Sequence, residues 1–252
     1  MALLIRWWHC SIMKSIRFQL KRVALKFLAR LGYAVVKVGS GRPQAARVVL
    51  QAQLIERNYR ILARSELYNR ISNLSGSIIE AGVAGGTGLC TFALLEDSRK
   101  LKRRIWGFDS FSGFPSGTSA DTLNFQKSGK IGYKDFSEDF VMEVLSSIPL
   151  SQEMLEKITL CGGFMPQSFS QYDLGPVALL NVDVDLYQST KDVLDFFWPL
   201  MESTGIVILD EYNSNNDTVK WPGAAKAIDE FCNSNLVKVQ RSIGNRAFLL
   251  KP

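Results

Sequence analysis

The fold is decided by the stretch at residues 78–88, which reads IIEAGVAGGTG. An apolar run ends in an acid and passes into closely spaced glycines, and a helical pattern then covers 86–97. Glycines let the backbone turn tightly and approach a ligand, and the first turn of a helix offers free N–H groups. The stretch therefore predicts a strand, a turn and a helix around a ligand site. The alternative is a tight strand–helix turn that binds no ligand.

The pattern of this turn is E-x-G-x-x-G-G, which differs from the G-x-G-x-x-G of dinucleotide-binding proteins. An acid at the position of Glu80 suits a cationic ligand that carries an amino acid better than a pyrophosphate. Asp109 ends the next apolar run, 27 residues after Gly82, and can accept both hydroxyls of a ribose. We therefore expect the turn, with Val83, Gly85, Gly86 and Thr87, to hold a nucleoside cofactor.

Strand and helix patterns alternate from residue 77 to the end of the chain. Apolar runs predict seven strands, at 77–82, 104–109, 157–161, 177–183, 205–210, 236–240 and 245–250. Helical patterns lie between them at 86–97, 137–148, 187–201 and 222–234. This alternation predicts an α/β fold with a Rossmann-like, doubly wound and mostly parallel sheet. The last two strands are joined by a short connection, which predicts an antiparallel terminal hairpin.

The chain before the sheet divides into a basic arm and a helical lead-in. Residues 1–47 carry ten basic side chains and no acid, so residues 48–252 hold 20 basic and 24 acidic residues, a net charge of −4. We expect an arm at 1–47 and a domain at 48–252, with a lead-in at 48–76 and a sheet core at 77–252. A helix is predicted over 44–72, with a break near Ser65. Since the positive charge is confined to the arm, nucleic acid is not an expected partner.

The arm contains an amphipathic helical pattern at 14–31, with basic residues beside its apolar face. Such a helix can lie on an anionic membrane surface, so we consider peripheral membrane contact through residues 1–40. The alternative is a helix that packs on the main domain or on a second subunit in a homo-oligomer. No signal peptide or membrane-spanning run is evident, and we expect a cytoplasmic protein, with the inner face of a membrane as the alternative.

Cysteine and histidine usage restricts the chemistry available to the domain. The four cysteines are isolated from one another, without zinc-site spacing, as in proteins of a reducing compartment. The only histidine, His9, lies in the arm. Histidine metal sites, Ser-His-Asp triads and Cys-His pairs are therefore excluded from the domain, and carboxylates, lysines, tyrosines or a metal must perform any acid–base step.

Carboxylates follow two of the predicted strands. Asp183 and Asp185 leave the fourth strand, and Asp210 and Glu211 leave the fifth. The carboxyl ends of adjacent parallel strands converge on the ligand crevice, so Asp185, Asp210 and Glu211 can share one hard cation. Oxygen ligands with room for water and substrate suit Mg²⁺ or Mn²⁺. The alternative is a set of solvated acids at strand ends.

These residues together resemble the macrocin-type O-methyltransferases, which methylate sugar hydroxyls on macrolides and related products. The resemblance covers about residues 66–250 and rests on DVDLYQST at 183–190, DEY at 210–212, EAGV at 80–83 and DSFSGFP at 109–115. It implies a class I fold and S-adenosylmethionine as cofactor, with Ser110 and Gly163 added to the cofactor site. It also implies that Asp185, Asp210 and Glu211 bind Mg²⁺, although the family commonly has Asp where this chain has Glu211.

The function expected on this basis is Mg²⁺-assisted O-methylation of a hydroxyl on a small molecule or glycan, with a sugar as the favoured acceptor. Asp185, or Asp183 beside it, can take the proton, and the aromatic-rich loop 110–136 is expected to close over the site. Two alternatives belong to other classes. One is a metal-dependent glycosyltransferase that uses Asp183-Val184-Asp185 as a D-x-D motif, and the other is a non-catalytic binding module.

Overall fold

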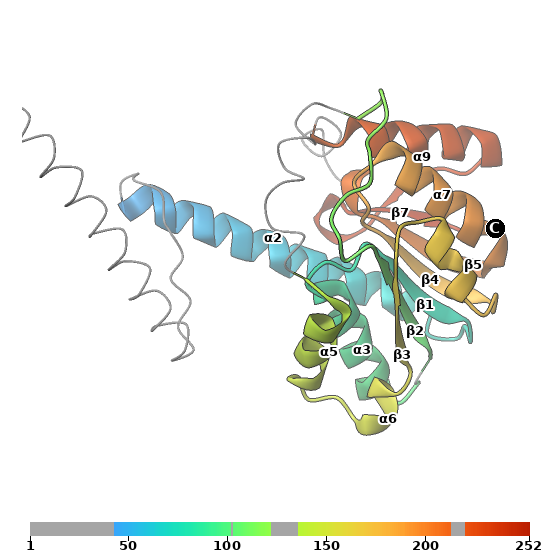
Figure 1. Cartoon of the computed structure of the whole chain (residues 1–252). Coiled ribbons are helices and arrows are strands. Elements are labelled where there is room, and N and C mark those ends of the chain that lie inside the picture. The colour runs from blue at the N-terminus through green and yellow to red at the C-terminus, as the bar shows by residue number, and fades with distance from the viewer. Residues whose placement is uncertain (1–42, 102, 122–135, 213–219) are drawn as a thin grey trace, which may run out of the picture. The chain divides into compact units, whose positions relative to one another are not determined.

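We describe the fold from a computed structural model, which describes residues 43–101, 103–121, 136–212 and 220–252 (Figure 1). The chain divides into two units between Leu54 and Ile55, and the second unit contains the whole sheet. Residues 1–42 of the expected basic arm, with the helix at 14–31, lie outside the described residues, whereas residues 43–47 form the start of the first described helix. Among the helices that are described, none is both long enough and apolar enough to cross a membrane.

A seven-stranded sheet forms the centre of the second unit. Its strands are β1 (Ser77–Ala81), β2 (Ile105–Asp109), β3 (Ile158–Gly162), β4 (Val177–Val182), β5 (Met201–Leu209), β6 (Gln240–Arg241) and β7 (Ala247–Leu250). The strand order is β3-β2-β1-β4-β5-β7-β6. The first five strands in this order are parallel, β7 runs antiparallel to β5, and β6 pairs antiparallel with β7. The predicted α/β sheet with an antiparallel terminal hairpin is thus confirmed.

Helices cover both faces of this sheet (Figure 1). The α-helices are α2 (Pro43–Arg70), α3 (Thr87–Arg99), α5 (Glu138–Ser146), α6 (Gln152–Leu155), α7 (Tyr187–Phe197) and α9 (Pro222–Asn235). One buried apolar layer joins the sheet to α7 and α9, and the other joins it to α3, α5 and the C-terminal part of α2. Strand β4 is buried along its whole length, as expected for a central parallel strand.

The predicted elements differ from the observed ones in four places, each with a physical reason. Helix α2 runs through Ser65 without a break, because the buried residues Leu67 and Tyr68 continue its packing on the domain. Helix α7 ends at Phe197, since Pro199 lies in the following 3₁₀ turn and cannot continue an α-helix.

Strand β5 begins at Met201 instead of 205, where exposed polar residues hide the strand pattern. Strand β6 is limited to two exposed residues at the sheet edge, so the apolar run expected at 236–240 is mostly outside it. These two differences leave the carboxyl ends of β4 and β5 where the sequence placed them.

A buried ion pair holds the end of α2 against α3 and the start of β2. Arg103 donates to Glu96 from its backbone N–H and its Nε, both at 2.7 Å, and Tyr68 donates to the same carboxylate at 2.8 Å. The Nη1 of Arg103 also donates to the carbonyl oxygen of Ile71 at 2.8 Å. Removing one partner of such a buried pair typically costs about 3–5 kcal/mol. This anchoring directs the preceding turns of α2 toward the carboxyl ends of β1 and β4.

Candidate active site

The glycine-rich turn brings the ends of β1 and β4 into backbone contact. The backbone of Gly82 has φ +91°, and a Cβ at this position would lie 1.8 Å from the carbonyl oxygen of Asp183. The N–H of Asp183 in turn donates to the carbonyl oxygen of Ala81 at 2.8 Å. Only glycine satisfies both the left-handed conformation and the close approach. The predicted cofactor turn and the predicted acidic motif are therefore parts of one site.

Asp109 holds the same turn from the end of β2. Its Oδ2 accepts hydrogen bonds from the backbone N–H groups of Val83 and Ala84, each at 2.9 Å, and its Oδ1 accepts from the N–H of Phe111 at 2.9 Å. Ala84 has φ +44°, a conformation that non-glycine residues rarely adopt. The carboxylate expected to bind ribose thus also fixes the shape of the loop, a role that the sequence pattern did not indicate.

We expect Asp109→Ala to weaken binding of S-adenosylhomocysteine about tenfold to a hundredfold, because two backbone N–H groups lose an ionised acceptor, each such bond being worth about 1.5–3 kcal/mol before relaxation. Isothermal titration of the full chain measures this change. Asp173→Ala, which removes a carboxylate paired with Arg104 on the surface, serves as control and should leave the affinity unchanged. Equal affinities of Asp109→Ala and the control would contradict the assignment.

Glu80 lies beneath the first turn of α3 and is almost fully buried, with 1% exposure. A Cβ on Gly88 would fall 1.7 Å from Oε1 of Glu80, and that oxygen accepts from Nδ2 of Asn181 at 2.9 Å. Burial raises the pKa of Glu80 to about 8, although the nearby guanidinium of Arg64 opposes the shift. Its Oε2 has no hydrogen-bond partner among the described residues.

The remaining residues of the predicted cofactor site border this turn. Gly86 caps α3 at its N-terminus, and no side chain of the described residues provides a hydrogen bond there. Thr87 opens the helix, and Ser110 donates to the carbonyl oxygen of Gly113 at 2.5 Å. Gly163 has φ +127°, and its N–H donates to the carbonyl oxygen of Asp109 at 3.0 Å. The turns after β1, β2 and β3 therefore meet on one side of the sheet.

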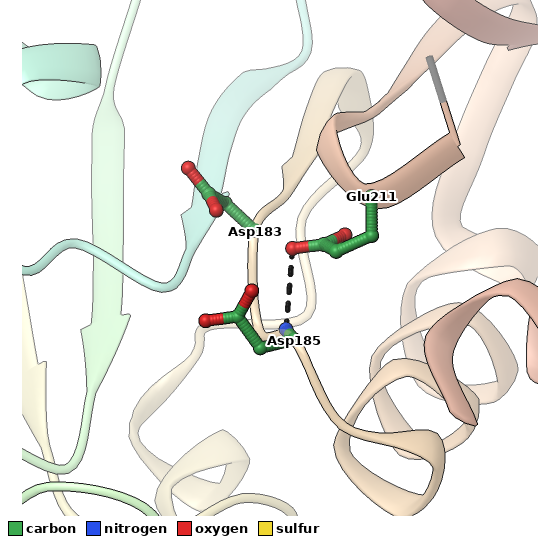
Figure 2. A group of neighbouring side chains, drawn as sticks. All are labelled: Asp183, Asp185 and Glu211. Atoms are coloured by element: carbon green, nitrogen blue, oxygen red, sulfur yellow. Dashed lines mark hydrogen bonds between the residues drawn. The ribbon is translucent and has the colours of Figure 1, made fainter. Parts of the chain in front are cut away.

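Three carboxylates gather beside the turn, as Figure 2 shows: Asp183, Asp185 and Glu211. Each offers an oxygen that lies within 4.8 Å of those of the other two. Asp183 and Asp185 follow β4, and Glu211 belongs to the 3₁₀ turn Asp210–Tyr212 after β5. The Oε1 of Glu211 accepts from the N–H of Asp185 at 3.2 Å, and its buried Oε2 has no hydrogen-bond partner in the described chain.

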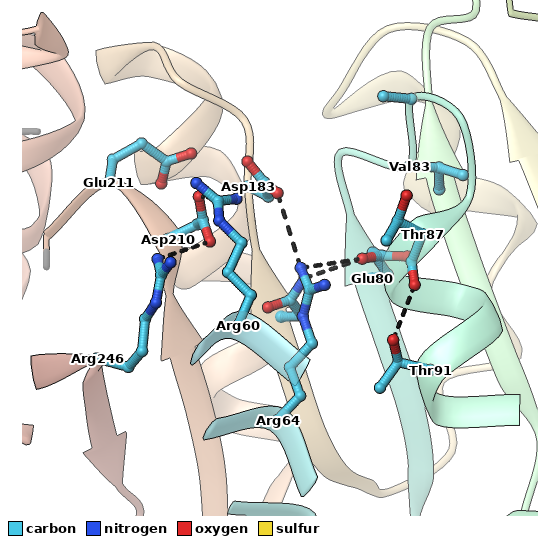
Figure 3. Close-up of polar contacts among 12 residues, drawn as sticks. Arg60, Arg64, Glu80, Val83, Thr87, Thr91, Asp183, Asp210, Glu211 and Arg246 are labelled. Atoms are coloured by element: carbon cyan, nitrogen blue, oxygen red, sulfur yellow. Dashed lines mark hydrogen bonds and ion pairs between the residues drawn. The ribbon is translucent and has the colours of Figure 1, made fainter. Parts of the chain in front are cut away.

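Asp210, the third predicted metal ligand, is engaged by two arginines (Figure 3). Its carboxylate lies 2.7 Å from Nη1 of Arg60 and 3.4 Å from Nη1 of Arg246. Arg64, one turn along α2 from Arg60, lies 4.0 Å from both Glu80 and Asp183. The structure thus groups Asp183 with Asp185 and Glu211, and it pairs Asp210 with Arg60 of α2 and with Arg246 just before β7.

Burial and mutual repulsion shape the electrostatics of the cluster. Burial raises the pKa of Asp183 to about 7, helped by the negative charge of Asp210 and opposed by Arg64 and Arg60. Burial and the charge of Asp183 also raise the pKa of Asp185 and of Glu211 well above their usual values. Buried acids that lie this close together disfavour the fully ionised state of the cluster.

The sequence reasoning missed the cations around this cluster. Arg60 and Arg64 are spaced four residues apart, as on one helix face, but the pattern did not show that this face meets buried acids. Arg246 is isolated next to the last strand and gave no signal. Lys220, whose charge opposes the rise in the pKa of Asp185, directly follows the undescribed segment 213–219.

The strand order, the glycine turn after β1 and the acid after β2 define the fold of class I methyltransferases. The structure of the O-methyltransferase NovP has a TM-score of 0.65 and 21% sequence identity, with 77% of this chain and 79% of that one covered. The calicheamicin methyltransferase CalS11 has a TM-score of 0.61 and 27% identity, with coverages of 76% and 78%.

Residues 37–244 match the model of the family Macrocin-O-methyltransferase (TylF), and the chain belongs to this family. The 8-demethyl-8-(2,3-dimethoxy-alpha-L-rhamnosyl)-tetracenomycin-C 4'-O-methyltransferase of Streptomyces olivaceus is 26% identical over 54% of this chain. The demethyldecarbamoylnovobiocin O-methyltransferase of Streptomyces niveus is 25% identical over 64%. The matches span 53% and 59% of these relatives, so the chain spans little more than half the length of the curated relatives it matches.

Proposed function

We propose that this chain transfers the methyl group of S-adenosylmethionine to a hydroxyl of a sugar, with a divalent metal held by the carboxylate cluster. The observation that carries the proposal is the close approach of Gly82 to the backbone of Asp183, which brings the glycine-rich turn next to the carboxylate cluster. Membership in a family of O-methyltransferases supports the reaction, and the rhamnosyl group in the name of one relative supports a sugar acceptor. These relatives give no support to the glycosyltransferase alternative.

The turns after β1, β2 and β3 fit S-adenosylmethionine. The N-cap residue of α3 is Gly86, which provides no side-chain cap, so the first N–H groups of the helix, apart from that of Leu89 bonded to Glu80, can meet a ligand. The carboxylate of Asp109 is already oriented by three backbone N–H groups and keeps lone pairs for ribose hydroxyls. Within the described part of the chain, the nearest atom that a Cβ on Gly163 would meet is the Cβ of Ser168, at 3.6 Å.

The cluster also fits Mg²⁺ or Mn²⁺. It consists of three oxygen ligands from two adjacent strand ends, and the unpartnered Oε2 of Glu211 is a buried acceptor that a cation would satisfy. A bound metal would lower the pKa of an acceptor hydroxyl and orient it. Asp183, Asp185 and Glu211 are the ligands in closest reach, while Asp210 would first have to leave Arg60 and Arg246.

The residues around the cluster would position and deprotonate the acceptor. Asp183 lies beside the glycine-rich turn, and in our proposal its carboxylate takes the proton of the acceptor hydroxyl. Asp185, two residues later in the chain, is the other candidate proton acceptor in our proposal. Phe136 lies over the turn, 3.2 Å from the Cβ that Gly85 lacks, and gives the site an apolar wall. The aromatic residues Phe125 and Tyr133 of the expected closing loop lie outside the described residues.

We expect affinity for Mn²⁺ to increase with pH between about 6 and 8, by up to roughly tenfold for each proton displaced per pH unit. The pKa of Asp183 is raised, so its carboxyl is protonated below pH 7 and must lose that proton to bind a cation. Titration of the full chain with Mn²⁺, followed by electron paramagnetic resonance, measures the dependence. An affinity that is flat over this range would argue against Asp183 as a ligand.

The proposed function is tested with methyl-labelled S-adenosylmethionine and a panel of acceptors: rhamnosides, other O-glycosides and catechol. We expect transfer to a glycoside, loss of transfer in EDTA and recovery with Mg²⁺. Binding of UDP-sugar with Mn²⁺, without binding of S-adenosylhomocysteine, would overturn the proposal in favour of glycosyl transfer. Full activity in EDTA would reject the metal and keep the methyltransferase.

Three further proposals concern the whole protein. The basic arm at 1–40 is proposed to contact a membrane surface, the chain to form a homo-oligomer, and the protein to act in the cytoplasm or at the inner face of a membrane. The first of these is checked by sedimenting the full chain, and a version that lacks residues 1–40, with vesicles that contain phosphatidylserine. Equal sedimentation of the two versions would reject it.

A further inference from the structure

Asp121 links the segment after β2 to the helices that follow the carboxylate cluster. Its Oδ1 accepts from the N–H of Tyr187 at 3.0 Å, and its Oδ2 accepts from the N–H and the Oγ1 of Thr118 at 2.7 and 3.0 Å. A Cβ on Gly223 would lie 1.9 Å from the same Oδ1. The carboxylate is therefore enclosed between the first turns of α7 and α9.

The backbone next to this contact is strained at Asp185. This residue has φ +63°, and the N–H of Leu186 donates to the carbonyl oxygen of Val184 at 2.6 Å. A three-residue turn with positive φ at its centre is rare and strained, and it persists only where its surroundings hold it. The surroundings here are two carboxylates: Glu211 accepts from the N–H of Asp185, and Asp121 accepts from the N–H of Tyr187.

Helix α7 also depends on Asp121 for its N-terminal cap. Its own N-cap residue is Leu186, whose side chain cannot accept a hydrogen bond. Asp121, 66 residues earlier, accepts from the first N–H of the helix and adds a negative charge at its positive end. The cap comes from a residue that also fixes the fold of its own segment through Thr118.

We propose that Asp121 is a positioning residue for methyl transfer, which holds the Asp185 turn in the conformation that presents its carboxylate to the metal and the acceptor. The inference rests on the proposed function for what Asp185 does. The way in which Asp185 is held does not depend on the proposed function. Glu211 fixes one end of the turn from β5, and Asp121 fixes the other end from the segment that follows the cofactor carboxylate Asp109. The cofactor side and the metal side of the site are thereby joined through one side chain.

The test compares Asp121→Ala, Asp121→Asn and the wild-type full chain, with Asp195→Ala as control. Asp195 lies in α7 and pairs with Lys191 at 2.8 Å on the surface. Its replacement by alanine removes the same charge as Asp121→Ala. Three quantities are measured: hydrogen exchange of the segment 183–190, affinity for Mn²⁺, and affinity for S-adenosylhomocysteine. Asparagine keeps a carbonyl oxygen for the N–H of Tyr187 but sets its amide NH₂ against the N–H of Thr118, so Asp121→Asn should fall between Asp121→Ala and the wild type.

In Asp121→Ala we expect exchange in 183–190 to accelerate about fivefold or more and Mn²⁺ affinity to fall about tenfold, as for a lost helix cap beside a strained turn. Affinity for S-adenosylhomocysteine should stay within about twofold, because Asp109 and the glycine turn are unchanged. A general loss of structure would instead weaken both ligands together.

Exchange in Asp121→Ala equal to that in Asp195→Ala would overturn the inference, as would equal losses of affinity for Mn²⁺ and for S-adenosylhomocysteine in Asp121→Ala. If the wild-type chain binds no Mn²⁺, the metal part of the proposed function fails, and hydrogen exchange of 183–190 alone decides the role of Asp121. The two failures are therefore distinguishable.

Discussion

Replacing Asp185 with asparagine is expected to reduce kcat for methyl transfer about 10³-fold, within the range of about 10²–10⁴ for loss of a group that moves a proton or holds a catalytic metal. Asparagine keeps the size of the side chain and tolerates the left-handed conformation at φ +63°. Alanine would add backbone strain to the loss of charge, so it is the less informative substitution. The rate is measured with the glycoside acceptor that the panel identifies.

The control for this prediction is the cofactor. The turn after β1 is held by Asp109, which accepts from the N–H groups of Val83 and Ala84, so affinity for S-adenosylhomocysteine should remain within about twofold of the wild-type value. Asp192→Asn, on the exposed surface of α7 where Gln188 donates to it at 2.7 Å, provides a matched substitution that should keep full activity. A kcat for Asp185→Asn within about tenfold of wild type would show that the cluster does not take part in the reaction.

Replacing Gly82 with alanine is expected to destabilise the protein by about 3 kcal/mol or more, because strain at φ +91° is added to an overlap with backbone. The added Cβ would meet the carbonyl oxygen of Asp183 at 1.8 Å, and neither strand end can move without disturbing the sheet. At about 2–4 °C per kcal/mol for a chain of this size, Tm should fall by about 10 °C. Binding of S-adenosylhomocysteine should be lost even where the chain still folds.

Gly85→Ala is the control for this second prediction. It lies in the same turn, its φ is outside the left-handed range, and its added Cβ would meet the ring of Phe136 at 3.2 Å. We expect a change in stability of no more than about 1 kcal/mol, since an aromatic side chain can shift by a few tenths of an ångström. Similar Tm values for the two variants would mean that β1 and β4 do not approach as closely as described.

Much of the fold could be predicted from local patterns. Alternating apolar runs and helical periodicity determine the order of strands and helices, and glycines at 82, 85 and 86 require a turn whatever the rest of the chain does. The short connection before β7 requires an antiparallel partner. Errors were confined to places where local pattern and packing disagree, such as the exposed start of β5 and the exposed strand β6.

The candidate site was predictable where its residues lie at strand ends, because parallel strands bring their carboxyl ends to one edge. Asp109, Asp183, Asp185 and Glu211 follow that rule. Their partners do not, since contacts between distant segments depend on how helices pack on the sheet. No sequence spacing relates Asp210 to Arg60 or Asp121 to Tyr187, although these contacts determine which acids stand together.

The sequence by itself determined the class of fold, the glycine-rich turn after the first strand and the set of acids from which we propose that a metal site is built. The tertiary structure alone decided how that set divides, with Asp183 beside Asp185 and Glu211, and with Asp210 paired to Arg60 and Arg246. The physical reason is the distance along the chain between the residues that interact. Backbone conformation follows from neighbouring residues, whereas the charge state and orientation of a buried carboxylate follow from cations that only packing brings near.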